Sequence, residues 1–110
     1  MKKVLLFSLK TDSISISMEL YFNEDGQLIF DGYDIGKSVK KYMGDSDYEY
    51  YYTIEKEEIE KFYPLFGLAL GDQPNLLKAL QEKFSVNEAY SLMGQFMDAH
   101  GIEYSAFTWR

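Results

Sequence analysis

The stretch DSISISMELYFNEDGQLIFD, residues 12–31, decides the fold. From Ser13 to Phe22 polar and apolar residues alternate strictly, which places all the apolar side chains on one face of an extended strand. NEDG at 23–26 is a turn sequence whose glycine can adopt a positive φ, and QLIFD then leads back as a partner strand. We therefore predict a β-hairpin over residues 12–31, with one face on a hydrophobic core.

A second alternating stretch, GDSDYEYYYTI at residues 44–54, predicts a strand over residues 46–54. One parity is aromatic and aliphatic: Tyr48, Tyr50, Tyr52 and Ile54. The other parity is mainly acidic: Asp45, Asp47, Glu49, Tyr51 and Thr53. We expect the tyrosine row to pack on the core. We expect the acidic row to face solvent, with Tyr51 exposed among the carboxylates.

The segments around these strands are less regular. KVLLFSL, residues 3–9, is apolar on both parities and predicts a more central strand. Residues 32–44 are punctuated by three glycines, so a structured loop and a short helical turn are both open there. Asp31 and Asp34 in FDGYDIG are interpreted as turn residues.

Helical periodicity follows. Residues 55–66 predict a helix with acids in its first turn, kinked or ended by Pro64 near Tyr63. After a loop at 71–75, a second helix is predicted over residues 75–84.

Ser85 and Glu88 suggest a capping box for a third helix, which His100 and Gly101 end. IEYSAFTW then predicts a last strand. The fold class is therefore α+β: one domain over residues 1–110, with an antiparallel sheet of about four to five strands and about three helices on one face.

Composition excludes several classes of site. The chain has 110 residues, 46% of them hydrophobic, which suits one domain with a real core. It has no cysteine, so disulfides and thiolate chemistry are excluded and the reducing cytoplasm is the expected compartment. The apolar run in MKKVLLFSL is too short for a secretory leader, and no stretch is long enough to span a membrane.

The negative charge is local. The formal net charge is -7, and residues 42–60 alone hold seven acids against one lysine. Such a field repels nucleic acid and anionic membrane and attracts basic partners. A solvated face that only keeps the protein soluble is the plain alternative.

Catalytic motifs are largely missing from the sequence. His100 is the one histidine and reads as a helix-end residue, and there is no nucleophile elbow or phosphate-binding loop. Asp45 and Asp47 are the best pair for a divalent cation, although the downstream ligands of a calcium loop are absent. We expect no cofactor and no metal.

Two segments, DGYDIGKSVKKYMGDSDYEYYYTIEKEEIEKF at 31–62 and HGIEYSAFTW at 100–109, carry a family resemblance. They look like small uncharacterised bacterial proteins, some of which are similar to immunity proteins that neutralise toxins used between bacteria. The resemblance implies a cytoplasmic inhibitor and supplies no catalytic residues.

The main hypothesis is a non-enzymatic acidic module that binds a basic protein, such as a nuclease toxin, as a monomer or homodimer. Its predicted contact residues are Asp45, Asp47, Glu49, Tyr51, Glu55, Glu57 and Glu58. Two alternatives stay open: a small carboxylate- or metal-dependent enzyme, and an oligomeric adaptor that pairs strands between subunits.

Overall fold

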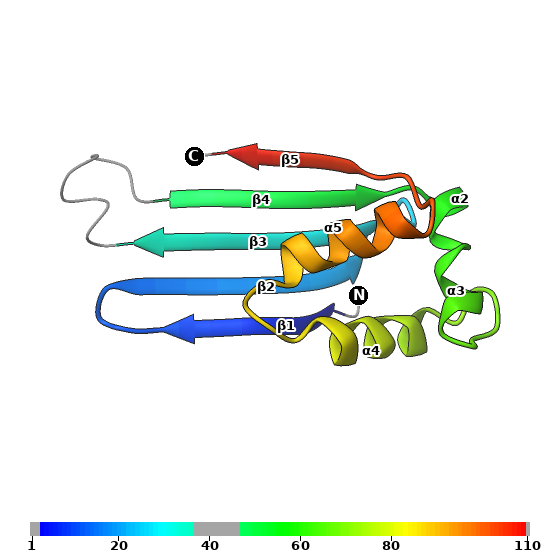
Figure 1. Cartoon of the computed structure of the whole chain (residues 1–110), viewed down its shortest axis with the longest axis horizontal. Coiled ribbons are helices and arrows are strands. Elements are labelled where there is room, and N and C mark those ends of the chain that lie inside the picture. Colours follow the sequence, from blue (N-terminus) through cyan, green and yellow to red (C-terminus); the bar gives the residue numbers. More distant parts are fainter. Residues whose placement is uncertain (1–2, 37–46, 110) are drawn as a thin grey trace.

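A five-stranded antiparallel sheet with helices on one face makes up the fold (Figure 1). The computed structural model describes residues 3–36 and 47–109. The strands lie side by side in chain order: β1 (Lys3–Lys10), β2 (Ile14–Phe22), β3 (Leu28–Gly36), β4 (Asp47–Ile54) and β5 (Ser105–Trp109). The helices are α2 (Lys56–Ile59), α3 (Phe62–Leu65), α4 (Gln73–Phe84) and α5 (Ala89–Ala99). The predicted α+β class is confirmed, with α2 and α3 standing where one helix was expected.

The central hairpin forms as predicted. β2 pairs with β3 from Phe22 opposite Leu28 through to Ile14 opposite Gly36. The Asn23 side-chain oxygen accepts the Gln27 N–H at 2.9 Å, which closes the turn. The alternation has the expected result, because the apolar parity of both strands is buried under the helices.

The prediction that residues 3–9 form a central strand is wrong. β1 is an edge strand, and Leu5 and Leu9 are exposed. A bulge between Leu5 and Phe7 shifts the register, so Leu6 and Phe7 both turn toward the core. The bulge, rather than burial on two faces, accounts for apolar residues on both parities.

The interpretation of Asp31 and Asp34 as turn residues is also wrong. β3 continues through both of them to Gly36, so residues 32–36 are strand, and residues 37–44 lie outside the described residues. Gly32 is a site of close approach rather than a turn, since a Cβ there would lie 2.2 Å from Cε2 of Tyr50. The Tyr50 hydroxyl reaches across it and donates to Asp34 at 2.7 Å.

The first helical segment breaks one turn earlier than expected. α2 and α3 are single turns that separate around Glu60, whereas the predicted break was near Tyr63. Pro64 has no N–H to donate to the Glu60 carbonyl, so the run of α-helical hydrogen bonds is interrupted at Glu60.

α4 begins at Gln73, two residues before its predicted start, so the expected loop at 71–75 is shorter. The Asp72 carboxylate accepts the Asn75 N–H at 3.4 Å and caps the helix, and Pro74 occupies the first turn, where its missing N–H costs nothing.

The predicted capping box at Ser85 is wrong. The Ser85 hydroxyl donates back to the carbonyl of Gln81 and closes α4 instead. α5 begins at Ala89 after Glu88, which makes no side-chain cap bond. The predicted end of this helix is confirmed, because Gly101 has a φ of +66°.

An aromatic layer joins α5 to the sheet. The Tyr90 ring stacks on Tyr52 with centroids 4.0 Å apart. The Tyr90 hydroxyl donates to the Tyr51 carbonyl at 3.1 Å, and the Tyr52 hydroxyl donates to the Tyr90 carbonyl at 2.8 Å. Tyr50, Tyr52 and Ile54 are at most 5% exposed, so the predicted inward tyrosine row is confirmed for these positions.

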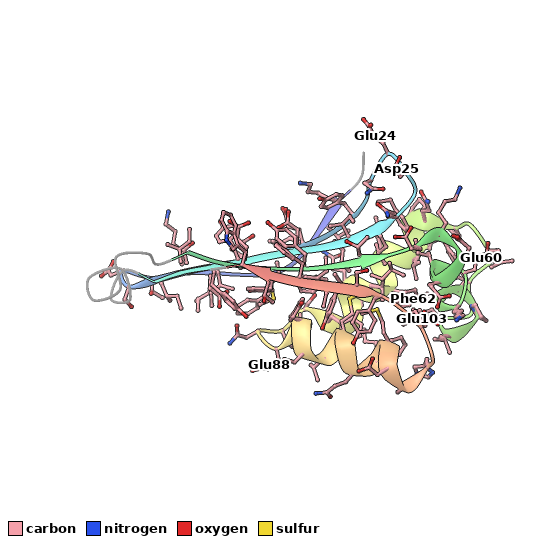
Figure 2. The ribbon with its side chains drawn as sticks, turned by 90° about the horizontal axis from the view of Figure 1, so that it is seen from above. Glu24, Asp25, Glu60, Phe62, Glu88 and Glu103 are labelled. Atoms are coloured by element: carbon pink, nitrogen blue, oxygen red, sulfur yellow. The ribbon has the colours of Figure 1, made fainter. Side chains whose placement is uncertain are left out.

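Seen along the sheet, the long helices lie on one side only (Figure 2). The residues that face them form the core, which includes Leu20, Leu28, Phe30, Phe62, Leu76, Leu80, Met93 and Met97. The opposite face of β2, β3 and β4 has no helix over it in Figure 2, and we call it the open face. In the described part of the chain, no helix has the length and hydrophobicity to cross a bilayer.

Candidate functional site

The open face carries a patch in which carboxylates and aromatic rings alternate across neighbouring strands. The sheet register forms two rows. In the first, Glu19 lies opposite Asp31, which lies opposite Tyr51, which lies opposite Phe107. In the second, Tyr33 lies opposite Glu49, which lies opposite Trp109. With Ile35, these residues form what we call the open-face patch.

Much of this patch is exposed apolar surface. Phe107 is 59% exposed and Trp109 is 62% exposed, while Tyr33 and Ile35 are less so. Five residues line a shallow hollow of about 310 Å³ in the middle of it: Asp31, Tyr33, Ile35, Glu49 and Tyr51. These residues come from β3 and β4, and they include two tyrosines and two carboxylates. Exposed apolar surface with a polar rim is typical of protein interaction sites.

The carboxylates of the patch repel one another. Partial burial raises the pKa of Asp31 above its ordinary value, and the negative charges of Glu19 and Glu49 raise it further. Lys3 opposes this shift and lies 3.5 Å from Glu19, but it does not cancel it. A row of like charges opposite one another disfavours the folded sheet. The patch is therefore negative in the free chain, with Lys3 beside Glu19 partly offsetting its charge.

Glu49 and Tyr51 act as a pair. The Tyr51 hydroxyl donates to the Glu49 carboxylate two residues before it on the same face. That hydrogen bond is the main reason that the pKa of Tyr51 is raised to about 12. The Tyr51 ring also contacts Phe107, with centroids 6.2 Å apart. The two predicted residues Glu49 and Tyr51 are thus fixed together at the centre of the open-face patch.

The other predicted contact residues divide between two places. Glu55 directly follows β4 and accepts a hydrogen bond from the Gln27 amide at 2.9 Å. Glu57 and Glu58 lie in the first turn of α2, at the end of the sheet. Asp45 lies outside the described residues. Asp47 begins β4, on the parity of Glu49, and its side chain is not described.

The Glu58 carboxylate is already engaged by two groups within the protein. Its Oε1 lies 2.7 Å from the Lys61 ammonium and accepts the Glu103 N–H at 2.8 Å. These two interactions lower the pKa of Glu58. The residue fastens α2 to the chain that leads into β5, so it is less free to contact a partner than the exposed Glu57.

Sequence reasoning missed six residues of the patch: Asp31, Tyr33, Ile35, Glu19, Phe107 and Trp109. The first three share one parity in β3, where Leu28 and Phe30 hold the other. That alternation was present in the sequence, but the glycines at 32 and 36 obscured it. Phe107 and Trp109 likewise share a parity in β5.

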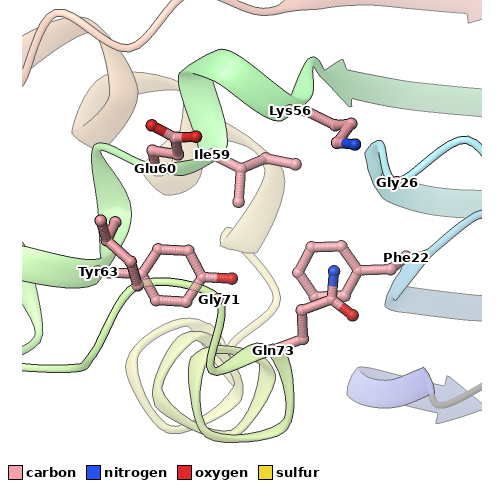
Figure 3. Close-up of a pocket in the computed structure, with 9 residues that line it drawn as sticks. Phe22, Gly26, Lys56, Ile59, Glu60, Tyr63, Gly71 and Gln73 are labelled. Atoms are coloured by element: carbon pink, nitrogen blue, oxygen red, sulfur yellow. The ribbon is translucent and has the colours of Figure 1, made fainter.

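A second hollow of about 300 Å³ lies at the end of the sheet (Figure 3). Phe22, Ile59 and Tyr63 provide its apolar wall, and Lys56 and Glu60 are the charged residues that line it. Its lining residues include no histidine and no serine or threonine. The hollow therefore offers no pairing of a serine or threonine nucleophile with a histidine base.

The described residues form neither a metal-binding cluster nor a catalytic arrangement around a histidine. Among residues 3–36 and 47–109, no three histidine, aspartate or glutamate side chains lie close enough together to hold a metal ion. His100 is exposed at the end of α5, and its ring packs on Phe96 with centroids 4.5 Å apart. It caps the helix, as its position predicted.

In comparisons with known proteins, the chain matches no protein-family model, no curated protein and no solved structure.

Proposed function

We propose that the chain is a non-enzymatic acidic module that binds a basic protein through the open-face patch. The class of partner we propose is a bacterial toxin with a cationic surface, such as a nuclease, which the chain would neutralise as a cytoplasmic immunity-type inhibitor. The patch geometry supports the basic partner. The immunity role depends on the sequence resemblance.

The observation that carries the proposal is the Glu19–Asp31 pair on the open face. These carboxylates lie directly opposite each other on adjacent strands, and their repulsion contributes to the raised pKa of Asp31. Like charges in this position cost stability. A cationic side chain from a partner would lower the repulsion and gain affinity from it.

The aromatic residues supply contact area. A guanidinium placed in the hollow would meet the Asp31 and Glu49 carboxylates and could stack on the rings of Tyr33 and Tyr51. Tyrosine adds large contact area at a small cost in side-chain entropy. An arginine-bearing surface therefore fits the patch better than a lysine-bearing one, because only arginine combines stacking with paired hydrogen bonds.

The test is affinity capture. The tagged chain is the bait, host lysate with candidate toxins is the prey, and the wash is done at low and high salt with mass-spectrometric identification. We expect one basic protein that is lost at high salt, since screening shortens the reach of the carboxylates.

A charge-matched pair of variants then locates the contact. The double substitution Asp31→Asn and Glu49→Gln should weaken binding by roughly tenfold or more, which corresponds to ~1.4 kcal/mol, mainly through the association rate. The control, Glu82→Gln with Glu88→Gln, removes the same charge from exposed positions on the helix side. Equal losses in the two variants would mean that net charge, and not the patch, holds the partner.

A further inference from the structure

The two edges of the sheet are protected unequally. β1 begins and ends with lysine, contains the bulge at Leu5, and packs against α4. The Gln81 side-chain amide donates to the Leu5 carbonyl at 3.0 Å. Charges, bulges and covering groups are the means by which proteins keep an edge strand from pairing with another chain. The β1 edge is therefore blocked in three ways.

β5 has none of these protections. The strand SAFTW has no charged residue, whereas each of the other four strands carries at least one. All five of its residues are exposed, and it pairs with β4 on one side only. Figure 1 shows no described element along its other side. Phe107 and Trp109 on this strand are the most exposed aromatic residues of the described chain.

We infer that β5 pairs with β5 of a second copy of this chain, which joins two sheets into one continuous sheet across a two-fold axis. The absence of charge on β5 permits a second copy at this strand. Most of the net charge of -7 lies on residues 42–60, where seven acids stand against one lysine, so contacts through that segment repel another copy. β5 offers a neutral contact.

Screening makes this contact tolerable for the acids nearby. The closest described carboxylate row is on β4, at Glu49 opposite Trp109. In the paired sheet the two β4 rows would be three strand spacings apart, or roughly 14 Å. The Debye length at physiological salt is about 8 Å, so the two rows interact weakly.

The strand is also complementary to itself. An antiparallel pairing centred on Phe107 places Phe107 opposite its own copy and Ser105 opposite the partner's Trp109. Antiparallel strands tolerate this symmetry because their hydrogen bonds run in reciprocal pairs. The contact is isologous, as in most homodimers. It extends the ring contact between Tyr51 and Phe107 across the axis.

The first test is the mass of the unmodified chain in solution, measured by sedimentation velocity or light scattering over a concentration series. We expect the average mass to rise from 12.9 kDa toward twice that value and not to fall as salt is raised, since screening weakens the repulsion between two negative copies. A constant 12.9 kDa at the highest concentration overturns the inference. So does growth beyond a dimer, which would mean pairing without closure.

Phe107→Lys is the matched variant, because it places two ammonium groups opposite each other on the axis. It should stay monomeric at concentrations where the unmodified chain is dimeric. Leu70→Lys makes a comparable change at a 70% exposed residue between α3 and α4 and should still dimerise. A dimer that persists in Phe107→Lys contradicts β5 as the interface.

Amide hydrogen exchange on the unmodified chain keeps the test independent of any variant. Successive N–H groups of β5 point to opposite edges, so alternate amides should gain protection only as concentration rises. Protection that does not change with concentration overturns the pairing. Glu49→Gln should leave the dimer intact, so the dimer and the docking of a basic partner can fail separately.

Discussion

At the scale of single residues, Gly32 allows the Tyr50 ring to pack directly against the backbone of β3 on the helix side of the sheet. The Tyr50 ring lies against the Gly32 Cα, and the Tyr50 hydroxyl reaches Asp34 on the helix side of β3. This contact lets Tyr50 lie buried against Tyr90 of α5, on the same side of the sheet as Asp34. Only glycine allows it, because any Cβ would overlap the ring.

We therefore predict that Gly32→Ala destabilises the protein by about 1–3 kcal/mol, the usual cost of overpacking a core. The measurement is urea denaturation followed by circular dichroism. The control is the same substitution combined with Tyr50→Ala. If the ring is the cause, most of the cost of Gly32→Ala disappears in that background. An equal cost in both backgrounds would point instead to the backbone of β3.

Asp31 gives a second prediction at this scale. Asp31→Asn should raise the free energy of unfolding at pH 7 by roughly 0.2–1 kcal/mol, because it removes a like-charge pair from adjacent strands. Its raised pKa means that the folded protein holds the proton more tightly than the unfolded chain does. The penalty in the native protein is therefore full above the folded pKa and vanishes below the ordinary value of 3.8.

The gain from Asp31→Asn should accordingly shrink as the pH falls toward 3.8. Asp12→Asn, at an exposed position between β1 and β2, is the control and should change stability little at any pH. Loss of stability in Asp31→Asn at neutral pH would show that the carboxylate is satisfied in the free protein, which would remove the main support for a cationic partner.

At the scale of elements, α5 is held by close contact between Gly94 and Tyr52. A Cβ on Gly94 would lie 2.3 Å from the Tyr52 hydroxyl, which donates to the Tyr90 carbonyl. Two effects compete in Gly94→Ala. Alanine is favoured over glycine inside a helix by about 1 kcal/mol. Against this stand the loss of the hydrogen bond and about 1–3 kcal/mol of overpacking.

We expect the clash to win, so that Gly94→Ala lowers the thermal midpoint. In a Tyr52→Phe background the hydroxyl is gone, and the same substitution should then raise it relative to Tyr52→Phe alone. Thermal unfolding of the four proteins measures both signs. A rise in both backgrounds would mean that α5 can shift on the sheet at little cost.

The elements also show what the sequence can and cannot predict. Strict alternation in residues 13–22 predicts β2 correctly, because one face is buried from Ile16 to Phe22 while the other face is only half-buried. The prediction wrongly places β1 at the centre of the sheet, because a bulge between Leu5 and Phe7 imitates the sequence pattern of a strand buried on both faces. The sequence prediction ends β3 too early, because Gly32 has the look of a turn residue. Its actual role is close packing with Tyr50, a residue 18 positions away that no local pattern reveals.

The candidate site follows the same logic. Glu49 and Tyr51 could be predicted because parity alone places them on the solvent face. Their neighbours Asp31 and Phe107 depend on strand order, since only the pairing of β3, β4 and β5 brings them beside Tyr51. Periodicity assigns a face to each residue, but it does not assign neighbours across a sheet.

At the scale of the whole molecule, the proposed binding surfaces have different chemistry. The open-face patch is acidic, so its contact with a basic partner should weaken as salt rises, while the neutral β5 contact joins two negative copies and should not weaken. A dimer through β5 would double the patch into one wider surface, because the open faces of the two copies would be continuous. Salt dependence therefore separates the two associations in a single preparation.

The last prediction concerns the stability of the free chain. With a net charge of -7, and with acids opposed on the open face, the native state is destabilised by its own repulsion. Raising NaCl from ~10 mM to ~1 M shortens the Debye length from ~30 Å to ~3 Å and should relieve that repulsion. Relief of about 1 kcal/mol would raise the thermal midpoint by roughly 4–8 °C in a domain near this size.

The scan is made at a low, fixed protein concentration, because dimerisation would also raise the midpoint. The double variant Glu19→Gln with Asp31→Asn should start from a higher midpoint and gain less from salt, since the opposed pair is already neutral. If the variant gains as much as the native chain, the repulsion is spread over the whole surface. The open-face patch would then attract a basic partner no more strongly than the rest of the surface does.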